Sequence, residues 1–293
     1  MGDDCSVVKF GSETLLFTTD MLTESTHFRY CRTQEQKGRM AMAVNLSDIA
    51  AMGGKPVFAL ISMGVPPSMD KRAVIRFANG IYRAAEKSGV RVIGGDTKSA
   101  QELTVSVTLC GRTVAKPLLR SGARPGDYLA VTGTLGGASC AHYALSRGLS
   151  KNTRGLCNPV PRLAEGMKLA KSGMVTAAID ITDGLALSAW YISRASGVRM
   201  DIDREAIPAD GRLARIDVRA DEREDMLLYW GGDYELLFTL SGDRAISALS
   251  RGKSLDFTVI GRVTSGKGVY ISEEGKRRKL DEKGYDSLAH GTA

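Results

Sequence analysis

Five short acidic motifs, each beside glycine, threonine or serine, carry the residue types of a metal and phosphate site. They are Gly2-Asp3-Asp4, Thr18-Thr19-Asp20, Asn45-Leu46-Ser47-Asp48, Gly94-Gly95-Asp96-Thr97 and Asp180-Ile181-Thr182-Asp183-Gly184. Carboxylates with neighbouring hydroxyls are hard oxygen ligands of the kind that Mg²⁺ takes together with substrate phosphates. Each motif taken alone is more typical of a turn. If the carboxylates converge, their mutual repulsion implies two or more divalent ions.

Three of these carboxylates come directly after predicted strands. The apolar and β-branched run 14–19 predicts a buried strand that ends at Asp20, and strands are likewise predicted before Asp96 and Asp180. Open sheets present ligand-binding groups at the ends of their strands. The pattern therefore favours one shared site over separate turns.

A helix expected at 36–53 makes a stronger case for one carboxylate. Its apolar residues cover nearly the whole circumference, while Asn45 and Asp48 form one narrow polar stripe. Such a helix is expected to be buried, and a buried carboxylate needs a cation or a full set of hydrogen bonds. Asp48 is therefore predicted to have a partner.

The rest of the chain predicts an α+β fold, that is, a two-domain α/β protein. In the first half we expect strands at 57–63 and 103–109 and a helix at 70–88. Turn-forming residues gather after position 118, so the predicted domains are 1–117 and 118–293. In the second half we expect helices near 137–147, 161–172 and 184–196, and strands near 128–132, 176–180, 198–203, 235–240, 256–262 and 268–272.

Three further candidates have two interpretations each, and a fourth has one. The glycine-rich stretch 132–137 lies between a strand and a helix, where it could cradle a phosphate or form a plain tight turn. Arg120 could grip a phosphate or lie on the surface. His27 could donate to a substrate phosphate or make a structural hydrogen bond. The stretch 230–235 by itself is typical of a loop.

Composition excludes several classes of protein. The net charge of +7 and the pI near 9.2 favour a field that attracts anionic phosphorylated substrates over a nucleic-acid surface, because aromatic residues make up only 6% and do not alternate with basic ones. The basic tetrad 276–279 is expected to be a solvated turn. Five scattered cysteines and three histidines argue against a disulfide framework and a zinc site. No membrane span or secretory signal is visible, so a cytoplasmic location is expected.

Taken in order, the motifs closely resemble those of thiamine-monophosphate kinases. The resemblance runs from residue 2 to about 287 and includes Arg-Ser-Gly-Ala-Arg-Pro-Gly-Asp at 120–127 and Gly-Gly-Asp-Tyr-Glu-Leu-Leu-Phe-Thr at 231–239. That family belongs to an ATP-binding superfamily shared with aminoimidazole ribonucleotide synthetase, selenophosphate synthetase and a hydrogenase maturation protein. The resemblance implies a homodimer whose amino-terminal mixed sheets join into a barrel, with ATP in the neighbouring groove and a carboxy-terminal α/β domain.

The resemblance also implies roles for individual residues. The magnesium ligands would be Asp4, Thr18, Thr19, Asp20, Asp48, Asp96, Asp180 and Asp183. ATP would be bound by Gly95, Asp96, Arg120 and Thr182, and thiamine monophosphate by His27, Asp233 and Tyr285. The family's Gly-Gly-Glu-Asp-Tyr is one residue shorter here, so Asp233 takes the place of a substrate-contacting glutamate. Asp20, Asp48, Asp96 and Arg120 would serve catalysis.

The reaction implied is direct in-line transfer of the γ-phosphoryl group of ATP to thiamine monophosphate, assisted by several Mg²⁺ ions. One alternative is another enzyme of the superfamily. A hydrogenase maturation protein is expected to end in cysteine, whereas this chain ends in Ala293. Selenophosphate synthetase is expected to carry a reactive cysteine or selenocysteine near a lysine, a setting that Cys5 lacks. The other alternative is a non-catalytic nucleotide or RNA binder, which would tolerate loss of Asp20 and Asp48 and bind with a steep salt dependence.

Overall fold

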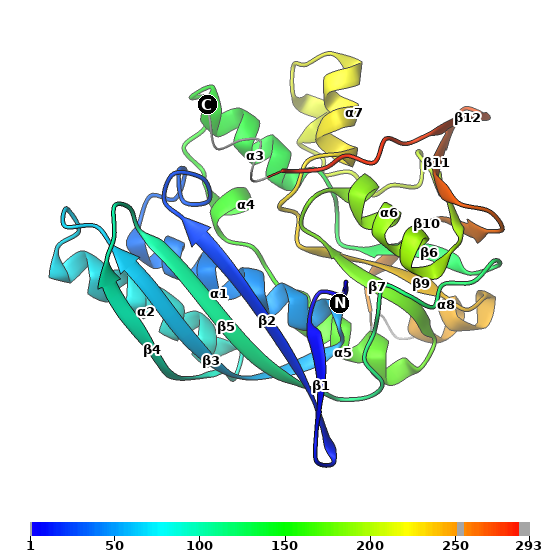
Figure 1. The fold of residues 1–293 in the computed structure, drawn as a ribbon. Coiled ribbons are helices and arrows are strands. Elements are labelled where there is room, and N and C mark those ends of the chain that lie inside the picture. The colour runs from blue at the N-terminus through cyan, green and yellow to red at the C-terminus, as the bar shows by residue number, and fades with distance from the viewer. Residues whose placement is uncertain (1, 251–254, 287–293) are drawn as a thin grey trace.

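Two β-sheets lying side by side form the frame of the protein in a computed structural model, which describes residues 2–250 and 255–286 (Figure 1). The first sheet has the order β1-β2-β5-β3-β4. Its strands are β1 (Ser6–Phe10), β2 (Glu13–Thr23), β3 (Gly54–Val65), β4 (Arg91–Ser99) and β5 (Thr104–Thr113). The β3–β4 pair is parallel and the other pairs are antiparallel, so the predicted mixed sheet is confirmed.

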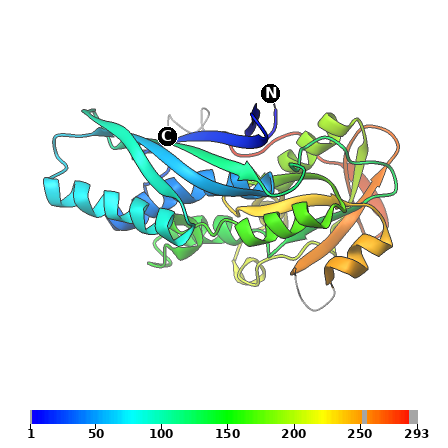
Figure 2. The ribbon, with the colours of Figure 1, turned by 90° about the horizontal axis from the view of Figure 1, so that it is seen from below.

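Helices α1 (Gln34–Ala51) and α2 (Lys71–Lys87) cover one face of this sheet (Figure 2). Val105, Val107 and Leu109 point into the core on that side, as their alternation predicts. A capping box between Thr33 and Gln36 begins α1, which is buried around most of its circumference. Among the described residues, no helix covers the opposite face of the sheet.

Glycines bring α1 and α2 into backbone contact. A Cβ atom added to Gly38 would lie 2.1 Å from the carbonyl oxygen of Phe77, and one added to Gly80 would lie 2.3 Å from that of Glu35. No side chain fits at either position. The close approach fixes the position of α1 and therefore of Asp48.

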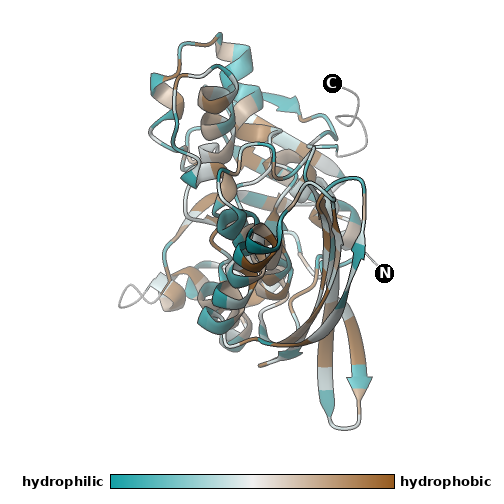
Figure 3. Cartoon of the chain, turned by 90° about the vertical axis from the view of Figure 1, so that its left-hand side faces the viewer, coloured by the Kyte–Doolittle hydropathy of each residue, from teal (hydrophilic) through white to brown (hydrophobic). Residues whose placement is uncertain are grey.

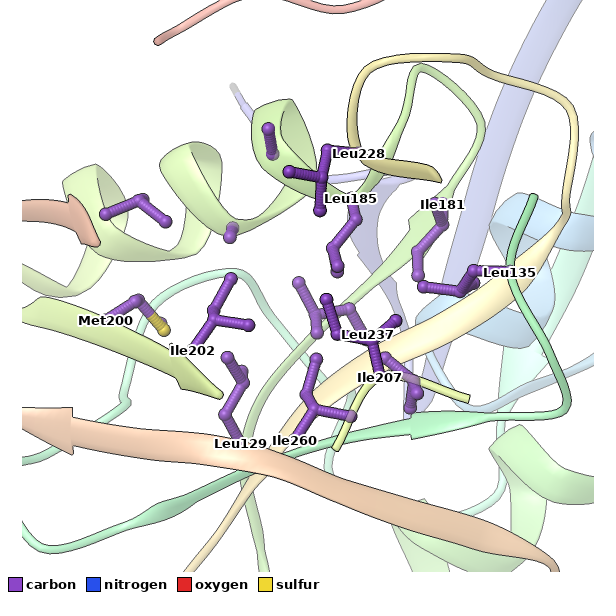
Figure 4. Packing of buried hydrophobic residues seen from close by; sticks show 14 of the residues in the cluster. Leu129, Leu135, Ile181, Leu185, Met200, Ile202, Ile207, Leu228, Leu237 and Ile260 are labelled. Carbon is purple, nitrogen blue, oxygen red and sulfur yellow. The ribbon is translucent and has the colours of Figure 1, made fainter. Parts of the chain in front are cut away.

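The second sheet has the order β12-β11-β8-β10-β6-β9-β7. Its strands are β6 (Tyr128–Thr132), β7 (Val175–Ile181), β8 (Arg199–Asp203), β9 (Glu235–Leu240), β10 (Phe257–Thr264), β11 (Gly268–Glu273) and β12 (Lys276–Lys279). The helices of this half are α3 (Gly137–Ser146), α4 (Arg154–Cys157), α5 (Leu163–Ser172), α6 (Leu185–Ser196), the 3-10 turn η1 (Leu213–Arg215), α7 (Ala220–Leu228) and α8 (Asp243–Ser250). Helix α6 packs on one face over the core drawn in Figure 4.

The two sheets are joined through small residues. Ala50 and Ala51, at the end of α1, pack with Leu236 and Phe238 of β9 in a third hydrophobic cluster. A Cβ atom on Gly166 of α5 would lie 2.0 Å from the carbonyl oxygen of Ala50, so α5 also meets α1 backbone to backbone. This packing brings the carboxyl end of β7 beside α1.

Several predicted boundaries are wrong. Strand β2 continues to Thr23 and β4 to Ser99, so Asp20 and Asp96 lie inside strands rather than after them. The Gly-Gly pair before Asp96 does not end the strand: the register against β3 shifts just before the pair, and Gly95 lets β4 pass the backbone of Ile61 closely. The basic tetrad is not a turn but the exposed edge strand β12. Charged edge strands protect a sheet from pairing with other chains.

Strand β1 and helices α4, α7 and α8 carry no periodic pattern that predicts them. These elements are short, so they carry few apolar positions from which a period can be recognised. Strand β1 depends on pairing with β2, since its own side chains are exposed. No helix in the described part of the chain is long and apolar enough to cross a bilayer.

Candidate active site

Three carboxylates from distant parts of the chain meet between the two sheets. Asp4 comes from the segment before β1, Asp48 from α1 and Asp180 from the end of β7. One oxygen from each lies within 4.8 Å of the others, a spacing that could hold a metal ion. The docking of α1 against β7 therefore creates the cluster.

The electrostatics of the cluster call for a cation. Burial and neighbouring carboxylates raise the pKa of Asp48 and Asp180 well above the ordinary value. Burial also raises the pKa of Asp4 to about 6, although Arg120 acts in the opposite direction. The Oδ2 atom of Asp4 is buried without a hydrogen-bond partner. A divalent ion would neutralise the carboxylates and give this oxygen a ligand bond, so the residues fit Mg²⁺.

Hydroxyl groups complete the inner surroundings of the cluster. Thr18 Oγ1 donates to Asp48 Oδ2, and Ser47 Oγ donates to Asp180 Oδ2 over 2.5 Å. The Ser188 hydroxyl donates to the backbone carbonyl of Asp180 at 3.1 Å. These bonds fix the carboxylates in orientation before any ion binds.

Asp20 and Asp183 flank the cluster. The backbone N–H of Asp20 donates to Asn45 Oδ1 over 3.1 Å, which is possible because β1 covers only the first part of β2. Burial and the Asp183 carboxylate raise the pKa of Asp20. Burial also raises the pKa of Asp183. The polar stripe of α1 therefore serves two purposes: Asn45 positions Asp20, and Asp48 joins the cluster.

Arg120 is the cation beside these carboxylates. Its Nη2 donates to Asp4 Oδ1 over 2.5 Å, and its backbone N–H donates to Asp3 Oδ1 over 2.7 Å. The guanidinium carbon lies 4.9 Å from the ring centroid of Tyr191. Its Nε has no partner. Arg120 is thus held with a free donor next to the cluster and could grip a phosphate.

Two predicted ligands do not join the cluster within one chain. The Thr19 hydroxyl lies on the open face of the first sheet, 3.2 Å from the hydroxyls of Ser106 and Thr108. Asp96 is paired in register with Ser62, which belongs to that same open face. Its side chain is exposed and lies 3.3 Å from Lys98. Alternation along a strand directs these side chains away from Asp20 and Asp48.

The predicted substrate and ATP residues are only partly brought together, with Thr182 and Tyr285 next to Asp183 and Gly95 on the distant strand β4. His27 Nδ1 accepts from Thr23 N over 3.3 Å and lies 2.6 Å from the Thr26 hydroxyl, and burial lowers its pKa. The backbone N–H of Tyr285 donates to the carbonyl of Asp183 over 3.0 Å. Thr182 lies between Asp180 and Asp183, whereas Gly95 lies in β4 next to Asp96.

The carboxylate of Asp233 binds the backbone at the end of the glycine-rich stretch 132–137, where a phosphate could have been cradled. Its two carboxylate oxygens accept from the backbone N–H groups of Gly136 and Ala138 at 2.8 and 3.0 Å. The phosphate-cradle interpretation of 132–137 is therefore wrong for these donors, since the protein's own carboxylate already satisfies them. Burial raises the pKa of Asp233 to about 6.

Tyr234 and Ser47 also lie at the site, although sequence reasoning gave them no role. Tyr234 is half-buried and packs against the core beneath the first sheet, and its backbone is left-handed with φ of 53°. Burial, followed by Asp20 and Asp180, raises its pKa. The only signal in the sequence was position, because each residue lies within a motif that was singled out for its carboxylates.

The fold and the site define the class of the protein. Residues 2–113 match the family model "AIR synthase related protein, N-terminal domain", and residues 124–273 match "AIR synthase related protein, C-terminal domain". The structure resembles that of E. coli HypE, a hydrogenase maturation protein, with a TM-score of 0.75 and coverage of 92% and 87% of the two chains. Identity is only 20%, so this likeness concerns the fold alone.

Nearer relatives define the family. The chain is 37% identical to a thiamine-monophosphate kinase of Pyrococcus horikoshii over 99% of this chain and 92% of that protein. It is 34% identical to "AaThiL complexed with AMPPCP and TMP", with a TM-score of 0.85 and coverage of 97% and 90%. A relative from Aquifex aeolicus, also 34% identical, is likewise a thiamine-monophosphate kinase. The chain belongs to the thiamine-monophosphate kinase family.

Proposed function

We propose that the protein transfers the γ-phosphoryl group of ATP to the phosphate of thiamine monophosphate and so forms thiamine diphosphate. The observation that carries this proposal is the cluster of Asp4, Asp48 and Asp180 beside Arg120, in which Asp180 is buried and the other two are half-buried. The relatives that support the substrates are named thiamine-monophosphate kinase, and one was solved with AMPPCP and TMP.

The chemistry fits a site that lacks a strong base. The nucleophile is a phosphate oxygen that already carries negative charge, so no proton has to be removed. The protein has to align two polyanions and reduce their repulsion. Arg120 supplies one positive charge and a free N–H donor at the cluster. Thr182 and Tyr285 lie on segments adjacent to Asp183.

Mg²⁺ would supply the remaining positive charge that both phosphate groups need. Asp4, Asp48 and Asp180 would hold it, and the Thr18 hydroxyl and Asp20 would complete the ligand set from β2. Asp183 lies beside the cluster, and its backbone carbonyl accepts a hydrogen bond from Tyr285. Each of these residues keeps its position through the bonds described above.

We propose that the protein is a homodimer formed through the open face of the first sheet. Met21, Leu60 and Ile93 are exposed on β2, β3 and β4 by 63%, 45% and 55%. The hairpin β1–β2 also exposes apolar side chains, with Phe10 74% accessible, and it projects from the body of the protein (Figure 3). Apolar surface of this extent on a sheet is typical of an interface.

This dimer gives Asp96 and Thr19 a common role. Within one chain, β5 and β3 separate β2 from β4, so the two side chains cannot meet. A two-fold axis that closes the two sheets into a barrel would bring β4 of the partner next to β2. We propose that Asp96 acts across this interface and completes the site of the other subunit.

The activity is tested by incubating the protein with ATP, Mg²⁺ and thiamine monophosphate and measuring thiamine diphosphate as it forms. We expect formation of one thiamine diphosphate and one ADP per reaction. Absence of product, or turnover on a substrate of another superfamily enzyme but not on thiamine monophosphate, contradicts the proposed function.

A further inference from the structure

Three aromatic rings from three distant segments meet beside the candidate active site. The ring centroids of Tyr30 and His142 lie 5.2 Å apart at an interplanar angle of 86°, and those of His142 and Trp230 lie 4.7 Å apart at 53°. Tyr30 follows β2, His142 lies on α3, and Trp230 precedes β9. We call these three side chains the aromatic platform.

Backbone contacts place the segment of Trp230 against the carboxylate site. A Cβ atom on the next residue, Gly231, would lie 2.1 Å from the carbonyl oxygen of Thr182. Gly232 N donates to that same carbonyl over 2.8 Å, and Tyr234 N donates to Ile181 O over 3.0 Å. The turn that begins at Trp230 therefore runs directly along the loop that carries Asp183.

The other two rings are tied to the same place. Tyr30 lies three residues after His27, in a turn closed by a bond from Cys31 N to Phe28 O of 2.9 Å. Helix α3, which carries His142, begins at the backbone groups that Asp233 holds. Asp233 belongs to the turn of Trp230, so His142 and Trp230 are carried by segments next to the proposed phosphate site, and the ring contact with His142 places Tyr30 beside them.

The platform lies at the margin of a hydrophobic core rather than inside it, because Tyr30 packs against the core beneath the first sheet but is only partly buried. Trp230 is 39% exposed in spite of its contact with His142, and the other two rings are partly exposed. Flat rings bind other aromatic rings by stacking, and the face of tryptophan attracts cations. Arg29 already lies 5.8 Å from the Tyr30 ring, so a cation is accommodated at one edge.

We infer that Tyr30, His142 and Trp230 bind the heterocyclic end of the phosphorylated substrate and determine its specificity. This inference rests on the proposed function. Thiamine has a neutral pyrimidine ring and a positively charged thiazolium ring, and the second suits the face of Trp230. The platform would bind the two rings of thiamine, while the carboxylate cluster and Arg120 would bind its phosphate. The two ends of one substrate are then bound by separate parts of the site.

Substitution of the rings tests this role through substrate affinity. Trp230→Ala and His142→Ala are each expected to raise KM for thiamine monophosphate about tenfold, since stacking contributes roughly 1–3 kcal/mol per ring. KM for ATP should not change, and Trp230→Phe should restore most of the affinity. A rise in KM for ATP instead would assign the rings to adenine and overturn the inference. So would unchanged kinetics, whether or not the melting temperature falls.

A binding measurement tests the inference without turnover. The chain has two tryptophans, and Trp190 does not contact the platform rings but donates from its Nε1 to Leu280 O over 3.2 Å. In Trp190→Phe, fluorescence comes from Trp230 alone. Unphosphorylated thiamine, added in the absence of ATP, should quench this fluorescence. In Trp230→Phe, the same addition should leave the fluorescence of Trp190 unchanged. If Trp190→Phe is quenched by thiamine but shows no kinase activity, the proposed function alone is contradicted. If it is active but not quenched, the proposed binding of thiamine by the platform is contradicted.

Discussion

Asp48 is the residue whose surroundings tie it most closely to a cation. It lies on a helix that is buried nearly all round, and two further carboxylates share its pocket. Thr18 donates a hydrogen bond to its carboxylate. A single hydroxyl does not offset the burial of a carboxylate next to two others, so this position favours an ion.

We expect Asp48→Asn to separate folding from catalysis. Removal of one negative charge relieves repulsion, so the metal-free variant should unfold at equal or higher denaturant concentration, with a gain of about 1–2 kcal/mol. Turnover should fall by about two to three orders of magnitude, because the ligand set loses a charge. Denaturation in the presence and absence of Mg²⁺ measures the first effect. Full activity, or an Mg²⁺-dependent stabilisation as large as in the unmodified protein, would remove Asp48 from the metal site.

Asp233 should make stability depend on pH in the acidic range. Burial raises its pKa in the folded state to about 6 from 3.8, so between these values the folded state binds the proton more tightly than the unfolded state. Its contribution is therefore full below about pH 4 and is lost as the pH rises through 6. The stability difference between the unmodified protein and Asp233→Asn should shrink by up to about 3 kcal/mol from pH 4 to 7. A difference that does not vary with pH would refute this assignment.

At the scale of elements, contacts between glycines and backbone hold the site together. Helix α1 meets α2 at Gly38 and Gly80, and it meets α5 at Gly166. Both contacts act on the helix that carries Asn45 and Asp48. The alignment of the carboxylates therefore depends on how closely these helices approach.

Gly38→Ala should push α1 away from α2. The added methyl group would overlap the backbone of Phe77, and overpacking of this kind costs roughly 1–3 kcal/mol. We expect lower stability in urea together with weaker activation by Mg²⁺. Gly211→Ala is the matched control, because nothing lies within 4 Å of its Cβ position and its φ is not positive. Equal stability of the two variants would show that the helices move apart without cost.

At the scale of the whole molecule, the two sheets meet on one side and leave one sheet face open on the other. The first contact builds the carboxylate cluster, and the open face carries Thr19, Asp96 and exposed apolar side chains. The proposed dimer would join these two halves of the ligand set, so one chain alone would hold an incomplete site.

A heterodimer of two inactive variants tests the shared site. Asp48→Asn and Asp96→Asn should each be inactive as homodimers. If Asp96 acts on the partner, the purified heterodimer has one intact site and should recover about half the activity of the unmodified dimer. If Asp96 acts within its own chain, both sites carry a lesion and the heterodimer stays inactive. Met21→Asp, placed on the open face, should give monomers in sedimentation and abolish the recovery.

Much of the fold followed from local patterns. The alternation in β5 and the apolar circumference of α1 set which faces are buried, because side-chain direction repeats every 2 residues in strands and every 3.6 in helices. The ordered motifs also identified the family, which the comparisons confirm. Short elements such as β1 and α7 escaped notice, since their stability comes from partners rather than from their own periodicity.

The sequence by itself determined that Asp48 would lie on the polar stripe of a buried helix, where its side chain is in fact half-buried, and that carboxylates with hydroxyl neighbours would be available for a metal. Only the tertiary structure decided which of them meet. Asp4, Asp48 and Asp180 converge because small residues let the second sheet dock against α1, whereas Asp96 faces the open side because of strand register. Strand register and the docking of the sheets depend on contacts between segments far apart in the chain, and no local pattern encodes such contacts. The same holds for the aromatic platform, whose rings come from three segments that only folding brings together.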